Sequence, residues 1–261
     1  MDRLPDYLDA LQSRGRYTVT KEEIVGATGQ LPRTAEAALR RLKEKRRVAS
    51  PRRGFYVIVP AEYREAGAPP PSWFVHDLMS FLEQPYYVGL LSAAELHGAA
   101  HQRPQELQVV TNRPTRPVQA GRGRIRFVKK ERVLSTPVQL MNTGAGSIRV
   151  STPEATALDL VRYARVSGYL DNVATVLREL AEGIDARLLA EAAYPGESAT
   201  AQRLGYLLER LGSGDKAERL ARAVASHRPS PVPLRPDIPE RRGAIDSRWQ
   251  VIINEEVEPD E

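Results

Sequence analysis

Residues 31–59 have the sequence LPRTAEAALRRLKEKRRVASPRRGFYVIV, and this stretch decides the fold of the N-terminal part of the chain. Pro32 suits the first turn of a helix, because its missing N–H group would be unpaired there anyway. No helix-breaking residue follows through Lys45, so we expect one continuous helix. At about 100° of rotation per residue, one face is apolar and holds Leu31, Ala35, Ala38, Leu39 and Leu42. The opposite face carries Arg33, Ala37, Arg40, Arg41 and Glu44.

Residues 48–59 predict two strands joined by a tight basic turn. Pro51 and Gly54 punctuate two β-prone runs, and Arg52 and Arg53 lie between these punctuating residues. We expect this basic hairpin to be a wing that follows the helix.

Two shorter helices are predicted upstream of this stretch. Apolar residues at helical spacing favour a helix over residues 6–13, which Gly15 ends. Thr20 and Glu23 have the spacing of a capping box, and the helix that they open ends at Gly29. The order of three helices and a two-stranded wing is typical of a winged helix-turn-helix. A winged helix kept for protein contacts is the alternative, and the clustered arginines favour DNA.

Charge is distributed unevenly along the chain. Residues 1–60 contain 13 Lys/Arg and 7 Asp/Glu residues, whereas residues 61–261 contain 25 and 26. When the chain is divided at residue 60, the excess positive charge lies in residues 1–60. Such a concentration of charge is expected of a surface that binds a polyanion.

Composition limits the class of protein. The 261 residues include no cysteine, which excludes disulfides, thiolate metal sites and cysteine nucleophiles. There is no apolar run long enough to span a membrane and no N-terminal signal-peptide pattern. We therefore expect a soluble cytoplasmic protein.

The sequence as a whole predicts an α+β protein. Its winged helix-turn-helix (1–60) is joined to a larger mixed α/β domain. Residues 61–72 contain three consecutive prolines and are predicted to be a Pro-rich linker. Residues 73–228 predict a small mixed or antiparallel sheet followed by several helices. Residues 229–261 predict a Pro-rich segment, a final strand near Trp249–Ile253 and an acidic tail.

Few residues in the larger domain suggest chemistry. His97 and His101 have metal-ligand spacing but no evident third ligand. A degenerate or active metal-dependent nuclease is the enzymatic alternative, with Asp237, Glu240 and Asp246 as its carboxylates. Arg248 stands where such a site would use lysine, and arginine does not release its proton to activate water. We therefore expect no enzyme, no catalytic residues, no metal site and no cofactor.

Three blocks of sequence resemble the AbiEi family of antitoxins. They are RGFYVIVP (53–60), YYVGLLSAAELHGAAH (86–101) and VSTPEATALDLV (150–161), and they occur in the order that the family has. The resemblance covers roughly residues 5–225. It implies an antitoxin of a type IV toxin–antitoxin system, linked to abortive infection as a phage defence in prokaryotes.

The resemblance also implies two activities. The N-terminal winged helix would act as a transcriptional regulator that represses its own promoter at inverted repeats in double-stranded DNA. The C-terminal domain would counteract a cognate nucleotidyltransferase toxin and assist cooperative DNA binding, with self-association on the DNA. An alternative is that the larger domain is chiefly a protein-interaction module that contacts the toxin directly.

The sequence assigns DNA-binding roles to ten residues. Arg33 and Arg40, central on the outer helix face, are expected to reach base edges in the major groove. Ala37 between them would allow close approach, and Thr34 would bind a phosphate or cap the helix. The residues expected to bind phosphates are Arg41, Lys45, Arg46, Arg47, Arg52 and Arg53.

Overall fold

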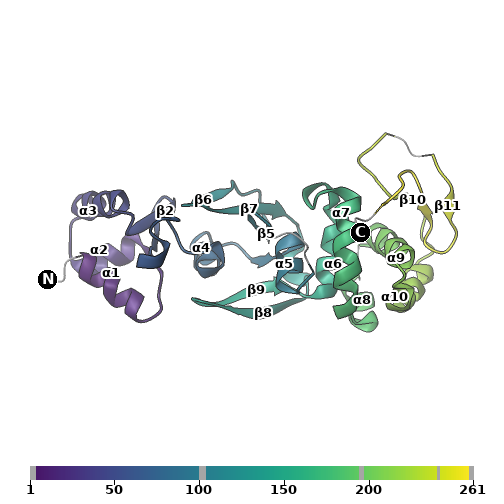
Figure 1. Ribbon diagram of the computed structural model, residues 1–261, viewed down its shortest axis with the longest axis horizontal. Helices are drawn as coiled ribbons and strands as arrows, with labels where there is room; N and C mark the ends of the chain where they lie inside the picture. The colour runs from purple at the N-terminus through teal and green to yellow at the C-terminus, as the bar shows by residue number, and fades with distance from the viewer. Residues whose placement is uncertain (1–3, 100–103, 194–196, 240–241, 259–261) are drawn as a thin grey trace. The chain divides into compact units, whose positions relative to one another are not determined.

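The computed structural model describes residues 4–99, 104–193, 197–239 and 242–258 (Figure 1). It confirms the α+β class, with helices and three separate sheets. The chain forms two compact units. The first contains Met1–Val88, Gln105–Leu134 and Leu140–Arg149, and the second contains Gly89–Pro104, Ser135–Gln139 and Val150–Glu261. None of the helices within the described ranges combines the length and hydropathy needed to cross a bilayer.

The first unit begins with three helices and a three-stranded antiparallel sheet. Its elements are α1 (Leu4–Ser13), β1 (Thr18–Thr20), α2 (Lys21–Thr28), α3 (Pro32–Glu44), β2 (Val48–Arg52) and β3 (Phe55–Ile58). The strand order is β1-β3-β2. Both hydrogen bonds of the predicted capping box between Thr20 and Glu23 are present, and Gly29 closes α2 in the left-handed conformation. The three-residue strand β1 was not predicted.

Apolar side chains from all three helices form one buried cluster in this part of the first unit. It holds Leu4, Leu8, Leu11, Val19, Ile24, Ala35, Leu39, Leu42, Val48 and Ile58. The predicted apolar face of α3 is correct for Ala35, Leu39 and Leu42 but wrong for Leu31, which is 75% exposed. Leu31 precedes the first helical turn with extended backbone angles, so it does not share the helical stripe.

Residues 61–72, predicted to be a linker, are packed within the first unit. They include the short 3-10 helices η1 (Ala61–Tyr63) and the start of η2 (Pro71–Trp73), which precede α4 (Val75–Phe81). The Trp73 ring lies 4.8 Å from the Tyr17 ring and 5.3 Å from the Tyr63 ring, measured between centroids. A Cβ atom placed on Gly121 would lie 2.1 Å from the Ala66 carbonyl oxygen, which shows how closely this segment approaches the turn before β7.

A six-stranded mixed sheet follows, most of it in the first unit. Its order is β6-β7-β5-β4-β9-β8, with a parallel β5–β7 pair and antiparallel β4–β5 and β6–β7 pairs. The strands are β4 (Tyr86–Val88), β5 (Leu107–Thr111), β6 (Val118–Ala120), β7 (Gly123–Lys129), β8 (Val138–Thr143) and β9 (Gly146–Ser151). The sheet is thus mixed, one of the two arrangements that the sequence predicts.

The second unit is mostly helical. It contains α5 (Leu90–Leu96), α6 (Pro153–Arg162), α7 (Tyr169–Leu180), α8 (Ala186–Ala192), α9 (Ser198–Arg210) and α10 (Gly214–Ser226). Helix α6 is buried over nearly its whole length, from Glu154 to Val161, so it forms the centre of this layer. Thr152 caps its N-terminus by accepting a hydrogen bond from the Ala155 N–H.

The C-terminal segment packs on this helical layer. It forms a small sheet of β10 (Val232–Pro233), β11 (Ile245–Asp246) and β12 (Val251–Ile252), so the predicted final strand is shorter than expected. Trp249 is fully buried, and a Cβ atom on Gly205 of α9 would lie 2.1 Å from its ring. The Gln202 amide donates hydrogen bonds to the carbonyls of Trp249 and Ser230, both at 3.0 Å. Residues 229–258 therefore belong to the second compact unit.

Candidate nucleic-acid interface

The outer face of α3 is basic and accessible. Arg33, Thr34, Arg40 and Arg41 are exposed, and Ala37 is half-buried among them. Arg33 and Arg40 form no hydrogen bond or ion pair with any described residue. Because the opposite face is anchored in the apolar core, these side chains are held outward on a rigid element.

The C-terminal end of α3 closes with an arginine where glycine is usual. Arg46 adopts the left-handed conformation with φ at 53°. Its N–H donates to the Lys43 carbonyl at 2.9 Å, and the Arg47 N–H donates to the Leu42 carbonyl at 2.8 Å. This is the Schellman pattern of helix termination, which glycine normally adopts at lower cost. Lys45 and Arg46 are exposed, so positive charge is kept at the end of the helix.

Two of the predicted phosphate-binding arginines are engaged within the protein. The Arg47 guanidinium forms an ion pair with Asp9 of α1. The Arg52 guanidinium donates to the backbone carbonyl of Arg116, and burial followed by the charge of Arg116 lowers the pKa of Arg52. Arg47 and Arg52 therefore form contacts within the first unit, in addition to the phosphate contacts that the sequence predicts for them.

The turn between β2 and β3 shares one electrostatic environment with α3. Arg53 and Gly54 form the two-residue turn between β2 and β3, with Gly54 at φ of 85°. The side chain of Arg53 is exposed. The pKa of Glu36 on α3 is lowered by its hydrogen bond from Lys21 and by further attraction to Arg53 and Arg33. Arg33 and Arg53 therefore act on the same carboxylate, one from the helix and one from the turn.

A second basic surface lies in the first unit, and the sequence reasoning missed it. Residues 105–149 contain nine Lys/Arg and two Asp/Glu residues. Arg113, Arg116 and Arg122 are exposed, and Arg124 and Arg126 both pair with the single carboxylate of Glu106 at 3.3 and 3.2 Å. Strand β6 contacts strand β2, so this surface adjoins the β2–β3 hairpin (Figure 1). Acidic residues elsewhere in 61–261 cancel this positive charge when the whole segment is summed. Counting charge in short windows along the sequence would have revealed the basic stretch.

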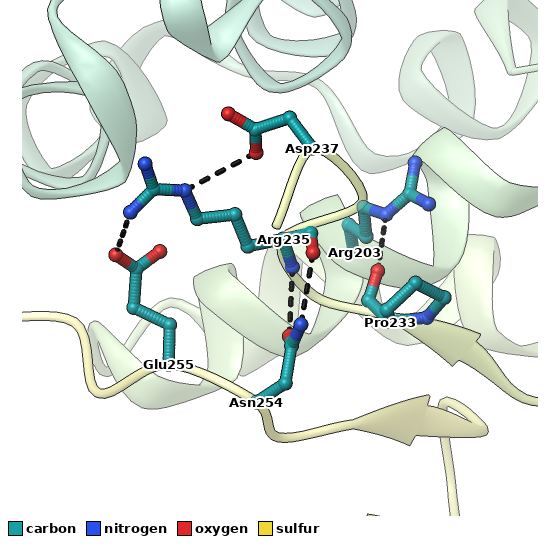
Figure 2. A network of polar contacts seen from close by, with 6 residues as sticks. All are labelled: Arg203, Pro233, Arg235, Asp237, Asn254 and Glu255. Atoms are coloured by element: carbon teal, nitrogen blue, oxygen red, sulfur yellow. Dashed lines mark hydrogen bonds and ion pairs between the residues drawn. The ribbon is translucent and has the colours of Figure 1, made fainter. Parts of the chain in front are cut away.

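The carboxylates considered for a nuclease are not assembled into a site. Figure 2 shows Asp237 accepting a hydrogen bond from Arg235 at 3.1 Å, while Arg235 also pairs with Glu255 and Asn254 binds the Arg235 backbone. Asp246 instead accepts backbone N–H groups of residues 248 and 249. Within the described ranges no three His, Asp or Glu side chains are grouped to hold a metal ion. Glu240 and His101 lie outside the described residues.

Comparison with known proteins gives one family and one fold. Residues 87–210 match the model of the family described as the AbiEi antitoxin C-terminal domain. The crystal structure of the RV2827C protein from Mycobacterium tuberculosis superposes with a TM-score of 0.66 at 15% identity, covering 94% of this chain and 89% of that one. At that identity the likeness concerns the fold alone. A search of curated proteins gave no match.

Proposed function

The chain carries the AbiEi antitoxin C-terminal domain over residues 87–210, and from this premise we propose that it is an antitoxin that also represses its own promoter. The family supports the antitoxin role. DNA binding rests on one observation above the others: α3 holds Arg33 and Arg40 exposed, with no hydrogen bond or ion pair to the residues that the structure describes, opposite a face fixed in the core.

In the proposed complex, α3 of the winged helix enters the major groove. This groove is about 12 Å wide and admits a helix. Arg33 and Arg40 contact base edges, and the small side chain of Ala37 lets the helix approach closely. Thr34, Arg41, Lys45, Arg46 and Arg53 contact phosphates, which set the register and make affinity depend on salt. Arg47 and Arg52 hold α1 and the wing in place in addition to any phosphate contact.

The second basic surface extends the proposed footprint. Arg113, Arg116 and Arg122 are exposed on the part of the first unit that adjoins β2. Duplex DNA flanking the base-reading helix would meet these side chains. Within residues 105–149 the only acidic residues are Glu106 and Glu131, so this stretch carries a net positive charge that phosphates would attract.

Promoter binding by the full-length protein tests the DNA-binding proposal. The double variant Arg33→Ala, Arg40→Ala should lose at least tenfold in affinity for a fragment of its own promoter, since bidentate arginine–guanine contacts provide about 1–3 kcal/mol each. Arg219→Ala removes an exposed arginine from α10 and serves as the control. Equal affinity of the folded double variant and the wild type would contradict the proposal.

The antitoxin proposal includes a nucleotidyltransferase toxin as its target, as the family resemblance implies. If antitoxin activity and repression are separate, the double variant expressed from an unrelated promoter should still rescue cells from the toxin. Failure of the folded variant to rescue would mean that DNA binding is required. Co-purification of the two full-length proteins would then separate direct contact from indirect opposition.

An enzymatic role is not proposed. The AbiEi antitoxin family is not an enzyme family. Asp237 and Asp246 are bound by separate partners, and neither is placed beside another acid that would complete a metal site among the described residues.

A further inference from the structure

The side chain of Leu31 is exposed to solvent at a position where neither core packing nor helix capping accounts for a leucine. Leu31 is 75% exposed, and it is the only large apolar residue so exposed among residues 4–88, all of which the structure describes. It occupies the N-cap position of α3, where its carbonyl accepts a hydrogen bond from the Ala35 N–H at 3.0 Å. Its side chain makes no capping bond, and leucine is among the poorest residues at that position.

The surroundings of Leu31 indicate what it would touch. Arg33 and Thr34 in the next turn are exposed, and Arg33 is one of the two proposed base-reading residues. The N-terminal residues of a recognition helix are those that contact base edges. A leucine side chain has nothing to offer a phosphate. The apolar feature that the major groove presents is the 5-methyl group of thymine.

We infer that Leu31 reads a thymine by packing against its 5-methyl group. The inference rests on the proposed function, because it places Leu31 at the groove end of α3. It adds a specificity-determining residue of a different chemical kind, since Arg33 and Arg40 would read hydrogen-bond acceptors and Leu31 would read an apolar group. On this inference, position 31 holds a leucine that contacts DNA in place of a residue such as serine that would cap α3 better.

Replacing thymine by uracil in the promoter fragment tests this contact, because uracil pairs identically but lacks the methyl group. Wild-type protein should bind the uracil fragment more weakly, by about fourfold for one buried methyl group. Leu31→Ala should bind the thymine fragment more weakly than wild type does. Its ratio of affinity for the thymine fragment to affinity for the uracil fragment should be smaller than the wild-type ratio, because the contact with the methyl group is lost. Leu31→Ser should behave like the alanine variant in binding while raising the thermal midpoint, because serine caps the helix.

Leu188→Ala is the control, since Leu188 is a leucine 40% exposed on α8 of the second unit, outside both proposed DNA-binding surfaces. It should keep the wild-type ratio. If Leu31→Ala lowers affinity equally for both fragments, or leaves both unchanged, the methyl contact is overturned while the proposed function stands. If the wild-type protein does not bind its promoter at all, the proposed function and the inference fail together.

Discussion

At the scale of single residues, the most informative positions are those where a side chain departs from its local preference. Leu31 was predicted from helical periodicity to be buried and is exposed, because periodicity assumes helical backbone angles that an N-cap residue lacks. Arg46 occupies a left-handed position that nothing in its side chain favours. Both residues flank α3, and for both we propose a contact with DNA.

Arg46→Gly should separate these two effects. Glycine adopts the left-handed conformation without strain, so the free energy of unfolding should rise by about 1 kcal/mol. The same change removes a cation from the proposed phosphate-binding set and should weaken promoter binding. Urea unfolding and a binding titration on one preparation measure both. A variant that is stabilised and binds as well as wild type would remove Arg46 from the interface.

At the scale of elements, helices were predicted better than strands. The capping box at Thr20 and the long stripe of α3 are strong local signals, and the structure has both. Strands β1 and β4 have three residues each, too few for an alternating pattern to show in the sequence. The basic face of α3 could be anticipated from phase, whereas the engagement of Arg47 with Asp9 depends on how α1 packs and could not.

Two glycines in helices should respond oppositely to alanine. Gly26 of α2 has open space around its Cα, so Gly26→Ala should stabilise the fold by about 0.5–1 kcal/mol. At Gly205 of α9 the new methyl group would lie 2.1 Å from the Trp249 ring. Overpacking typically costs about 1–3 kcal/mol and exceeds the gain in helix propensity. Gly205→Ala should therefore lower the urea midpoint; a midpoint at or above wild type would mean that Trp249 is not packed against α9.

At the scale of the whole molecule, the sequence predicted the class of fold but not the grouping of segments. The first compact unit combines three stretches of chain, and the second combines three others. The predicted boundaries at residues 60, 72 and 228 follow composition, and composition does not reveal which distant segments pack together. The second basic surface was hidden for the same kind of reason, because charge was summed over segments that the fold separates.

The triple variant Arg113→Ala, Arg116→Ala, Arg122→Ala tests whether this surface contacts DNA. Each phosphate contact contributes about 0.9 to the magnitude of the slope of log affinity against log salt concentration. If all three arginines contact phosphates, the magnitude of the slope should fall by up to about three times that amount. The Arg116 backbone carbonyl that binds Arg52 is retained in the variant. Substituting Arg187, Arg219 and Arg222, three exposed arginines of the second unit, provides the control. An unchanged slope in the first triple variant would confine the proposed interface to α3 and the β2–β3 hairpin.

The central claim is that the exposed arginines of α3 read promoter bases. The most direct test is to measure dissociation constants of wild type and Arg40→Ala on the operator and on a set of single-base-pair substitutions. The account predicts that Arg40→Ala loses discrimination at one base pair, by about 1–3 kcal/mol, and keeps it at the others. A uniform loss across all substitutions, or no loss, would contradict base readout by this face of α3.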